Sequence, residues 1–169
     1  MEIKLTDADF ERCVQFTDLQ MLKAQQNNFR IKYNQPAQKI YEHTLQGFLG
    51  EQAVANYFNY EIVYKGYNKA NYDVLGYEVR TVYYSNGILI THPIPEDKPG
   101  IYILVSIDKN EMVASLKGWS DIERCNERLE NWRADWRYPC FGMPQDQLWP
   151  IDTLPVTKEL LEHQNGLAS

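Results

Sequence analysis

Residues 71–82 read NYDVLGYEVRTV, and this stretch decides the fold that we expect for the chain. The dipeptide Leu75-Gly76 predicts a tight turn, because glycine readily adopts the backbone conformations that such turns require. A short strand on each side would place Asp73 at the end of the first strand and Glu78 at the start of the second. The two carboxylates can therefore meet across the turn.

The second strand would direct its side chains alternately to two faces. Glu78 and Arg80 are two residues apart and share one face, whereas Val79 points the other way, into a core. Upstream, residues 47–54 read GFLGEQAV, and we expect them in a helix packed on the same sheet. We expect Gly47 and Gly50 to let that helix approach the sheet closely. The helix would bring Glu51 to the same point, so that three carboxylates and one guanidinium converge.

Such a group of side chains is suited to metal-assisted phosphate chemistry. Magnesium binds oxygen ligands, and one or two carboxylates suffice beside its waters and the substrate phosphate. The bound ion polarises a phosphoryl oxygen and lowers the pKa of a water that becomes the nucleophile. Arg80 would neutralise the charge that develops on the phosphate, and Glu51 would orient the water or complete a second metal site.

With these residues in place, the chain resembles the PD-(D/E)xK nuclease superfamily, whose fold is called restriction-endonuclease-like. The resemblance covers residues 44–117, roughly. The helix around Glu51 is similar to the glycine-containing helix of the family, Asp73 matches its metal-binding aspartate, and residues 78–80 match its Glu-x-Lys element. The resemblance implies that Mg²⁺ or Mn²⁺ is held by Asp73, Glu78, Glu51 and the backbone carbonyl of Val79.

Two positions depart from the family pattern. Tyr72 stands where the family name has proline, and Arg80 stands where it has lysine. Arginine keeps its proton, so this position cannot act as a general base. Lys98 and Lys117 are possible stand-ins for the missing lysine, and the sequence does not place either.

We therefore predict metal-dependent hydrolysis of phosphodiester bonds in nucleic acid, with DNA as the expected substrate and a homodimer or protein partner possible. The predicted catalytic residues are Glu51, Asp73, Glu78 and Arg80. One alternative is a catalytically degenerate nuclease-fold protein that binds nucleic acid or a protein partner. Another is an unrelated α/β domain whose acidic residues are ordinary solvated surface charges.

The length of 169 residues predicts one α/β domain with a central mixed sheet of about four to five strands flanked by helices. We expect an N-terminal helix over residues 6–30, capped by Thr6 or Asp7, a core over 36–130 and an irregular C-terminal tail over 139–169 with a short terminal helix at Leu160 and Leu161. Strands are predicted at 60–64, 77–84, 88–91, 101–107 and 112–116, and residues 85–87 are expected to join the second and third of these as a hairpin. A further helix is predicted to begin at Ser120 and to extend past Trp132 and Trp136.

Composition limits the partners of the protein. The net charge of −6 disfavours tight non-specific binding to DNA. However, residues 19–41 contain no acidic residue and four basic ones, so this segment either contacts a phosphate backbone or is a polar helix end and linker. Three widely spaced cysteines, a charged N-terminus and the absence of a long apolar run predict reduced thiols in a soluble, cytoplasmic protein with no membrane contact.

Overall fold

The computed structural model describes residues 1–26, 36–64, 66, 72–93, 97–136 and 138–167. The described chain is α/β, with a mixed four-stranded sheet and a separate three-stranded sheet. The first sheet has the order β1-β5-β4-β2, formed by β1 (Glu2–Lys4), β5 (Val113–Asp121), β4 (Ile101–Asp108) and β2 (Tyr77–Val82). The second has the order β3-β7-β6, formed by β3 (Leu89–Thr91), β7 (Cys140–Met143) and β6 (Trp132–Arg133).

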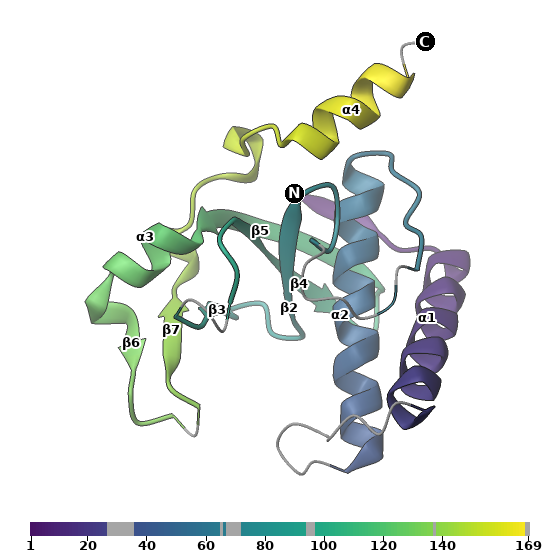
Figure 1. Cartoon of the computed structure of the whole chain (residues 1–169), viewed down its shortest axis with the longest axis horizontal. Coiled ribbons are helices and arrows are strands. Elements are labelled where there is room, and N and C mark those ends of the chain that lie inside the picture. The colour runs from purple at the N-terminus through teal and green to yellow at the C-terminus, as the bar shows by residue number, and fades with distance from the viewer. Residues whose placement is uncertain (27–35, 65, 67–71, 94–96, 137, 168–169) are drawn as a thin grey trace.

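Two long helices lie on one side of the four-stranded sheet. Helix α2 (Ala37–Tyr57) packs against β2, and α1 (Asp7–Gln26) packs against α2 on the side away from the sheet (Figure 1). Thr6 caps α1: its hydroxyl accepts a hydrogen bond from the Asp9 N–H (3.1 Å), and the Asp9 carboxylate accepts one from the Thr6 N–H (2.9 Å). The predicted cap is confirmed, and the last residues of the predicted 6–30 helix lie outside the described chain.

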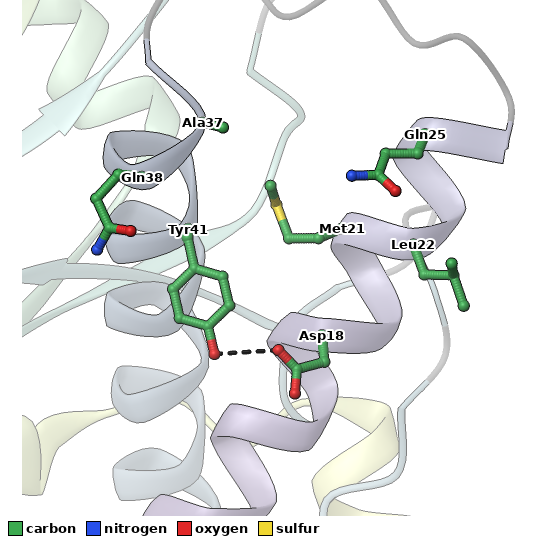
Figure 2. Close-up of a pocket in the computed structure, with 7 residues that line it drawn as sticks. All are labelled: Asp18, Met21, Leu22, Gln25, Ala37, Gln38 and Tyr41. Carbon is green, nitrogen blue, oxygen red and sulfur yellow. Dashed lines mark hydrogen bonds between the residues drawn. The ribbon is translucent and has the colours of Figure 1, made fainter.

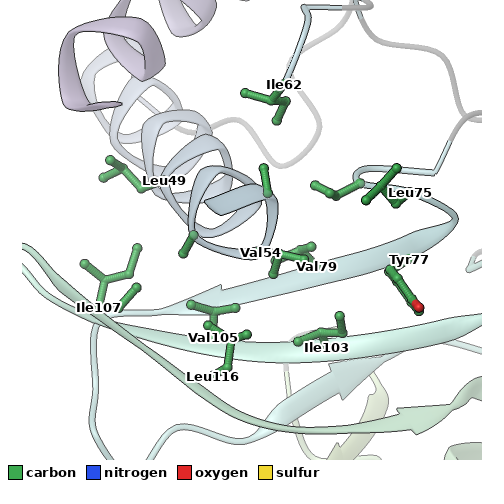
Figure 3. Packing of buried hydrophobic residues seen from close by; sticks show 14 of the residues in the cluster. Leu49, Val54, Ile62, Leu75, Tyr77, Val79, Ile103, Val105, Ile107 and Leu116 are labelled. Carbon is green, nitrogen blue, oxygen red and sulfur yellow. The ribbon is translucent and has the colours of Figure 1, made fainter. Parts of the chain in front are cut away.

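The central strand β4 is covered on both faces, as its continuous apolar sequence predicts. Ile103, Val105 and Ile107 belong to the cluster that includes Leu49 and Val54 of α2 (Figure 3). Alternate residues of β4 belong to a second cluster, which is completed by β3, β7 and helix α3 (Ile122–Glu127). The alternating side chains of one strand thus join two layers of the molecule.

Several predicted elements differ from the structure. Residues 60–64 form no strand, and β3 pairs with β7 instead of returning beside β2. One edge of β2 is occupied by the parallel neighbour β4, and the other is bonded by residues 73 and 74, so neither edge is open to these segments. The hairpin predicted at residues 77–91 is therefore wrong.

The helix predicted from Ser120 is confirmed as the short α3, but its extension past Trp136 is wrong. The strand β5 continues through Asp121, whose carboxylate caps α3 by accepting the Arg124 N–H (2.7 Å). The helix α3 ends at Glu127, and Trp132 lies in β6. The tail is less irregular than predicted, since it contributes β7, and the predicted terminal helix is confirmed as α4 (Lys158–Leu167).

The three cysteines Cys13, Cys125 and Cys140 are buried and form no disulfide, as predicted. Burial raises the pKa of the Cys13 thiol to about 12, so this side chain stays a neutral hydrophobe at physiological pH. Among the described helices, none is long and apolar enough to cross a membrane.

The two glycines of α2 allow a direct test of how the helix meets the sheet. A Cβ built on Gly50 would lie 1.8 Å from the Thr81 hydroxyl oxygen, whereas one built on Gly47 would have no neighbour within 4 Å. The predicted close approach of both glycines to the sheet is thus confirmed at Gly50 and wrong at Gly47. Gly50→Ala should lower the free energy of unfolding by about 1–3 kcal/mol through overpacking.

Gly47→Ala is the matched control, and its better helix propensity should raise the free energy of unfolding by up to about 1 kcal/mol. Urea unfolding of both variants measures the difference. Equal effects of the two substitutions would contradict the close contact between α2 and β2.

Candidate functional site

A two-residue turn places Asp73 against β2. Leu75 and Gly76 both have positive φ (48° and 85°), and Val74 forms an antiparallel bridge with Tyr77. The predicted turn is confirmed, although the residues before it form a single bridge and no strand. The Asp73 carboxylate accepts a hydrogen bond from the Val79 N–H (2.8 Å), which fixes it beside the strand.

The outer edge of β2 presents backbone oxygens as well as carboxylates. In a strand, the N–H and C=O of one residue point to the same side. Since the Val79 N–H points to Asp73, the Val79 carbonyl also points to this outer edge. The next outward carbonyl, that of Thr81, accepts a hydrogen bond from the Gln46 side chain (2.5 Å). The Val79 side chain packs into the α2 core, as predicted.

Glu51 approaches this edge from the helix. It follows Gly50, whose contact with Thr81 holds α2 close to β2. Desolvation raises the pKa of the Glu51 carboxyl well above its ordinary value, and the neighbouring carboxylates of Asp73 and Glu78 raise it further. The three acidic side chains predicted to converge therefore do interact in the structure.

Glu78 is the most buried of the three, with only 5% of the residue exposed. Burial raises its pKa, and Asp73 adds to this effect. The ammonium of Lys98 lies 2.6 Å from a carboxylate oxygen of Glu78 and opposes both effects. Burial also raises the pKa of Asp73, while its hydrogen bond from Val79 opposes the shift. These carboxylates are therefore not ordinary solvated surface charges.

Arg80 also lies at the site, but its guanidinium is engaged by the protein itself. It forms an ion pair with Asp97 (3.0 Å) and lies 3.7 Å from Glu78. It is also stacked over the ring of Tyr102, 5.0 Å from the ring centre. The other oxygen of Asp97 accepts a hydrogen bond from the His92 N–H (2.8 Å). The ion pair of Arg80 therefore connects Asp97 to β2.

The donors at this edge are the hard oxygens that magnesium and manganese prefer. Asp73, Glu78 and the Val79 carbonyl are the residues that could hold such an ion, with Glu51 beside them. Within the described residues, no three His, Cys, Asp or Glu side chains are already arranged as a metal-binding group. The fit rests on two carboxylates and a backbone carbonyl, a set that the family resemblance also implies.

Sequence reasoning missed part of the site. It named Lys98 without placing it, and it gave no role to Asp97. Asp97 and Lys98 could have been found from their position in the sequence, because they lie just before Gly100 and the buried strand β4. Strand β4 runs parallel to β2, and its first residue, Ile101, pairs with Tyr77. Loops before parallel neighbours begin at the same edge of a sheet.

Several tyrosines lie near Asp73 and Glu78 in the sequence, and the structure distributes them between different places. Tyr72 lies at the site, with its ring 4.8 Å from the Lys98 ammonium. Tyr77 stacks on Phe58 in the core, and Tyr83 lies under Lys109. Tyr67 lies outside the described residues. Strand packing thus accounts for Tyr77, and only Tyr72 of the described members contacts a residue of the site.

A separate groove of about 410 Å³ lies between α1 and α2 (Figure 2). The Tyr41 hydroxyl and the Asp18 carboxylate form a hydrogen bond across it (3.1 Å). Its α2 residues are at the start of that helix, and the 13 residues from Gln38 to Glu51 correspond to about 20 Å of helix. The groove is therefore distinct from the carboxylate site.

Comparison of the chain with protein-family models, curated proteins and solved structures gave no match.

The raised pKa of Glu51 makes a testable statement about stability. A carboxyl whose pKa is raised by folding binds more protons folded than unfolded, so stability falls as pH rises above its ordinary value near 4.5. Glu51→Gln removes this loss and should raise the melting temperature at pH 8 more than at pH 4. Each kcal/mol gained corresponds to about 2–4 °C.

Melting curves in chelator across this pH range measure the effect. Glu61→Gln, a change at an exposed carboxylate, is the control and should alter the melting temperature little at either pH. An unchanged or lower melting temperature of Glu51→Gln at pH 8 would show that the carboxylate is not destabilised by its surroundings.

Proposed function

We propose that this protein is a metal-dependent nuclease of the PD-(D/E)xK type, with a restriction-endonuclease-like core, that hydrolyses phosphodiester bonds in nucleic acid. The observation that supports the proposal is the convergence of Glu51, Asp73 and Glu78 at the outer edge of β2, where Asp73 raises the pKa of both Glu51 and Glu78. Mutually repelling carboxylates in a desolvated place are a typical feature of a functional site.

In this proposal, Asp73, Glu78 and the Val79 carbonyl hold Mg²⁺ or Mn²⁺. When bound, the ion supplies Lewis acidity and lowers the pKa of a water molecule. Asp73 is held in place for this role by the Val79 N–H. Glu51 orients the attacking water, because it faces the other two carboxylates from the opposite element, α2. Arg80 and Lys98 supply positive charge on the side of Glu78.

The expected substrate is DNA. The protein would contact the DNA either with the basic segment around Lys23 and Lys39 or with the carboxylate site itself. The net charge of −6 argues for a short contact with the phosphate backbone, since an extended one would meet repulsion. A second copy of the chain or another protein would enlarge the contact surface.

The second candidate is a catalytically degenerate protein of the same fold that binds nucleic acid or a protein partner. The ion pair of Arg80 with Asp97 favours it, because a neutralised guanidinium is less able to stabilise a phosphate. Metal-dependent stabilisation without cleavage of any nucleic acid would support this candidate over the first.

Asp73→Asn tests the proposed activity. The amide oxygen can still accept the Val79 N–H, so the fold should persist, while the charge that holds the metal is lost. We expect at least a 100-fold loss of cleavage and loss of the increase in melting temperature that Mn²⁺ produces by binding the native state. Labelled single- and double-stranded DNA and RNA, each incubated with Mn²⁺, provide the substrates.

Asp108→Asn is the matched control, since its carboxylate also accepts a backbone N–H (2.8 Å, from Asn110). It lies six residues along β4 from the partner of Glu78, about 20 Å away. Asp108→Asn should cleave like the wild type. Equal cleavage by Asp73→Asn and the wild type would exclude Asp73 as a metal ligand.

A further inference from the structure

We infer that Lys98, and not Arg80, is the cation that acts on the substrate phosphate, and that Arg80 is a positioning residue that holds Lys98 at the site. This inference rests on the proposed nuclease function, and it assigns different roles to the two basic residues. It comes from three observations: the partners of Lys98, the way its segment is anchored, and the partners of Arg80.

Lys98 is closely associated with the proposed metal ligands. Its ammonium lies 2.6 Å from Glu78, and its charge also lowers the pKa of Asp73. About a quarter of the side chain, 24%, is exposed, so a phosphate at the edge of the sheet can reach it. Lys98 thus brings a cation to Glu78 from a neighbouring element, in place of the lysine that residues 78–80 lack.

Two tyrosines hold the Lys98 segment against the sheet. The hydroxyl of Tyr102, which is fully buried on β4, donates a hydrogen bond to the Lys98 carbonyl (2.9 Å). The Tyr72 hydroxyl donates one to the Pro99 carbonyl (3.0 Å), and its ring lies under the Lys98 ammonium at 4.8 Å. A surface lysine would not need such anchoring, because a long flexible side chain loses entropy when it is held.

The same tyrosine connects the two basic residues. Tyr102 pairs in register with Glu78, binds the Lys98 carbonyl and stacks under the Arg80 guanidinium. Arg80 in turn binds Asp97, the residue before Lys98, at 3.0 Å. The planar guanidinium suits this role, because it can stack and donate in a fixed direction at once.

The arrangement gives Lys98 an effect on metal binding that is opposite to its effect on turnover. In the free protein the ammonium competes with a metal ion for Glu78. Removing the charge should therefore strengthen metal binding while weakening the stabilisation of the substrate phosphate. A variant with a merely damaged site would lose both properties, so the pair of measurements identifies the role.

The test compares Lys98→Gln, Lys98→Arg and Arg80→Gln with the wild type. For Lys98→Gln we expect turnover on the best substrate to fall about 100-fold or more, with Mn²⁺ binding roughly tenfold tighter by calorimetry. Lys98→Arg, which keeps the charge, should restore Mn²⁺ affinity to near the wild-type value and part of the turnover. Arg80→Gln should lose less than tenfold in turnover, with a lower melting temperature.

Lys117→Gln makes the same chemical change on β5, which β4 separates from β2, and it should match the wild type in every measurement. Wild-type cleavage with Lys98→Gln within about threefold of it, or a 100-fold loss in Arg80→Gln alone, would overturn the inference and leave the nuclease proposal intact. Weaker Mn²⁺ binding in Lys98→Gln would also overturn it. A wild type that neither binds Mn²⁺ nor cleaves would overturn the proposed function and the inference together.

Discussion

The close contact between Gly50 of α2 and Thr81 of β2 is the constraint on which the site depends. Because position 50 has no side chain, the helix lies directly on the edge strand, and Glu51 is carried to the carboxylates of β2. The same approach lets Gln46 bond the outward carbonyl of Thr81. A wider separation would move Glu51 out of range of Asp73 and Glu78 and leave the edge of the sheet exposed to solvent.

The site that results is electrostatically costly. Three carboxyl groups share a desolvated edge, where burial raises the pKa of each. Neighbouring carboxylates raise the pKa of Glu51 and Glu78 further. The Val79 N–H opposes the shift at Asp73 and the Lys98 ammonium opposes that at Glu78, with Arg80 acting on both, whereas burial, Asp73 and Glu78 all raise the pKa of Glu51. Proteins retain such local instability where a ligand relieves it. A cation is the ligand that would relieve it here.

The sequence predicted the local parts of this structure better than the distant ones. The Leu75-Gly76 turn, the Thr6 cap and the two-faced burial of β4 follow from residues that are adjacent along the chain, and all three are confirmed. The pairing of β3 with β7 across about fifty residues could not be predicted, because strand partners depend on which sheet edges other segments already occupy. The convergence of Glu51, Asp73 and Glu78 was predicted from the turn, from the strand that follows it and from a helix packed on the same sheet, and the family resemblance links the same residues.

The contact of Lys98 with Glu78 could not be predicted from the sequence. One basic residue near a carboxylate in sequence, Arg80, was assigned to the phosphate, whereas the structure gives it the partner Asp97 and brings Lys98 to Glu78. That exchange depends on the parallel pairing of β2 with β4, which sets the loop before β4 beside the start of β2. The spacing of Asp73, Glu78 and Arg80 along the sequence does not predict this pairing.

The central claim is that the outer edge of β2 binds a divalent metal ion. Anomalous diffraction at the manganese edge from a crystal soaked in Mn²⁺ tests it most directly, because the signal locates the ion independently of activity. The account predicts one strong peak between the Asp73 and Glu78 carboxylates, next to the Val79 carbonyl. A map without a peak there, or with its strongest peak on another part of the molecule, would contradict the account.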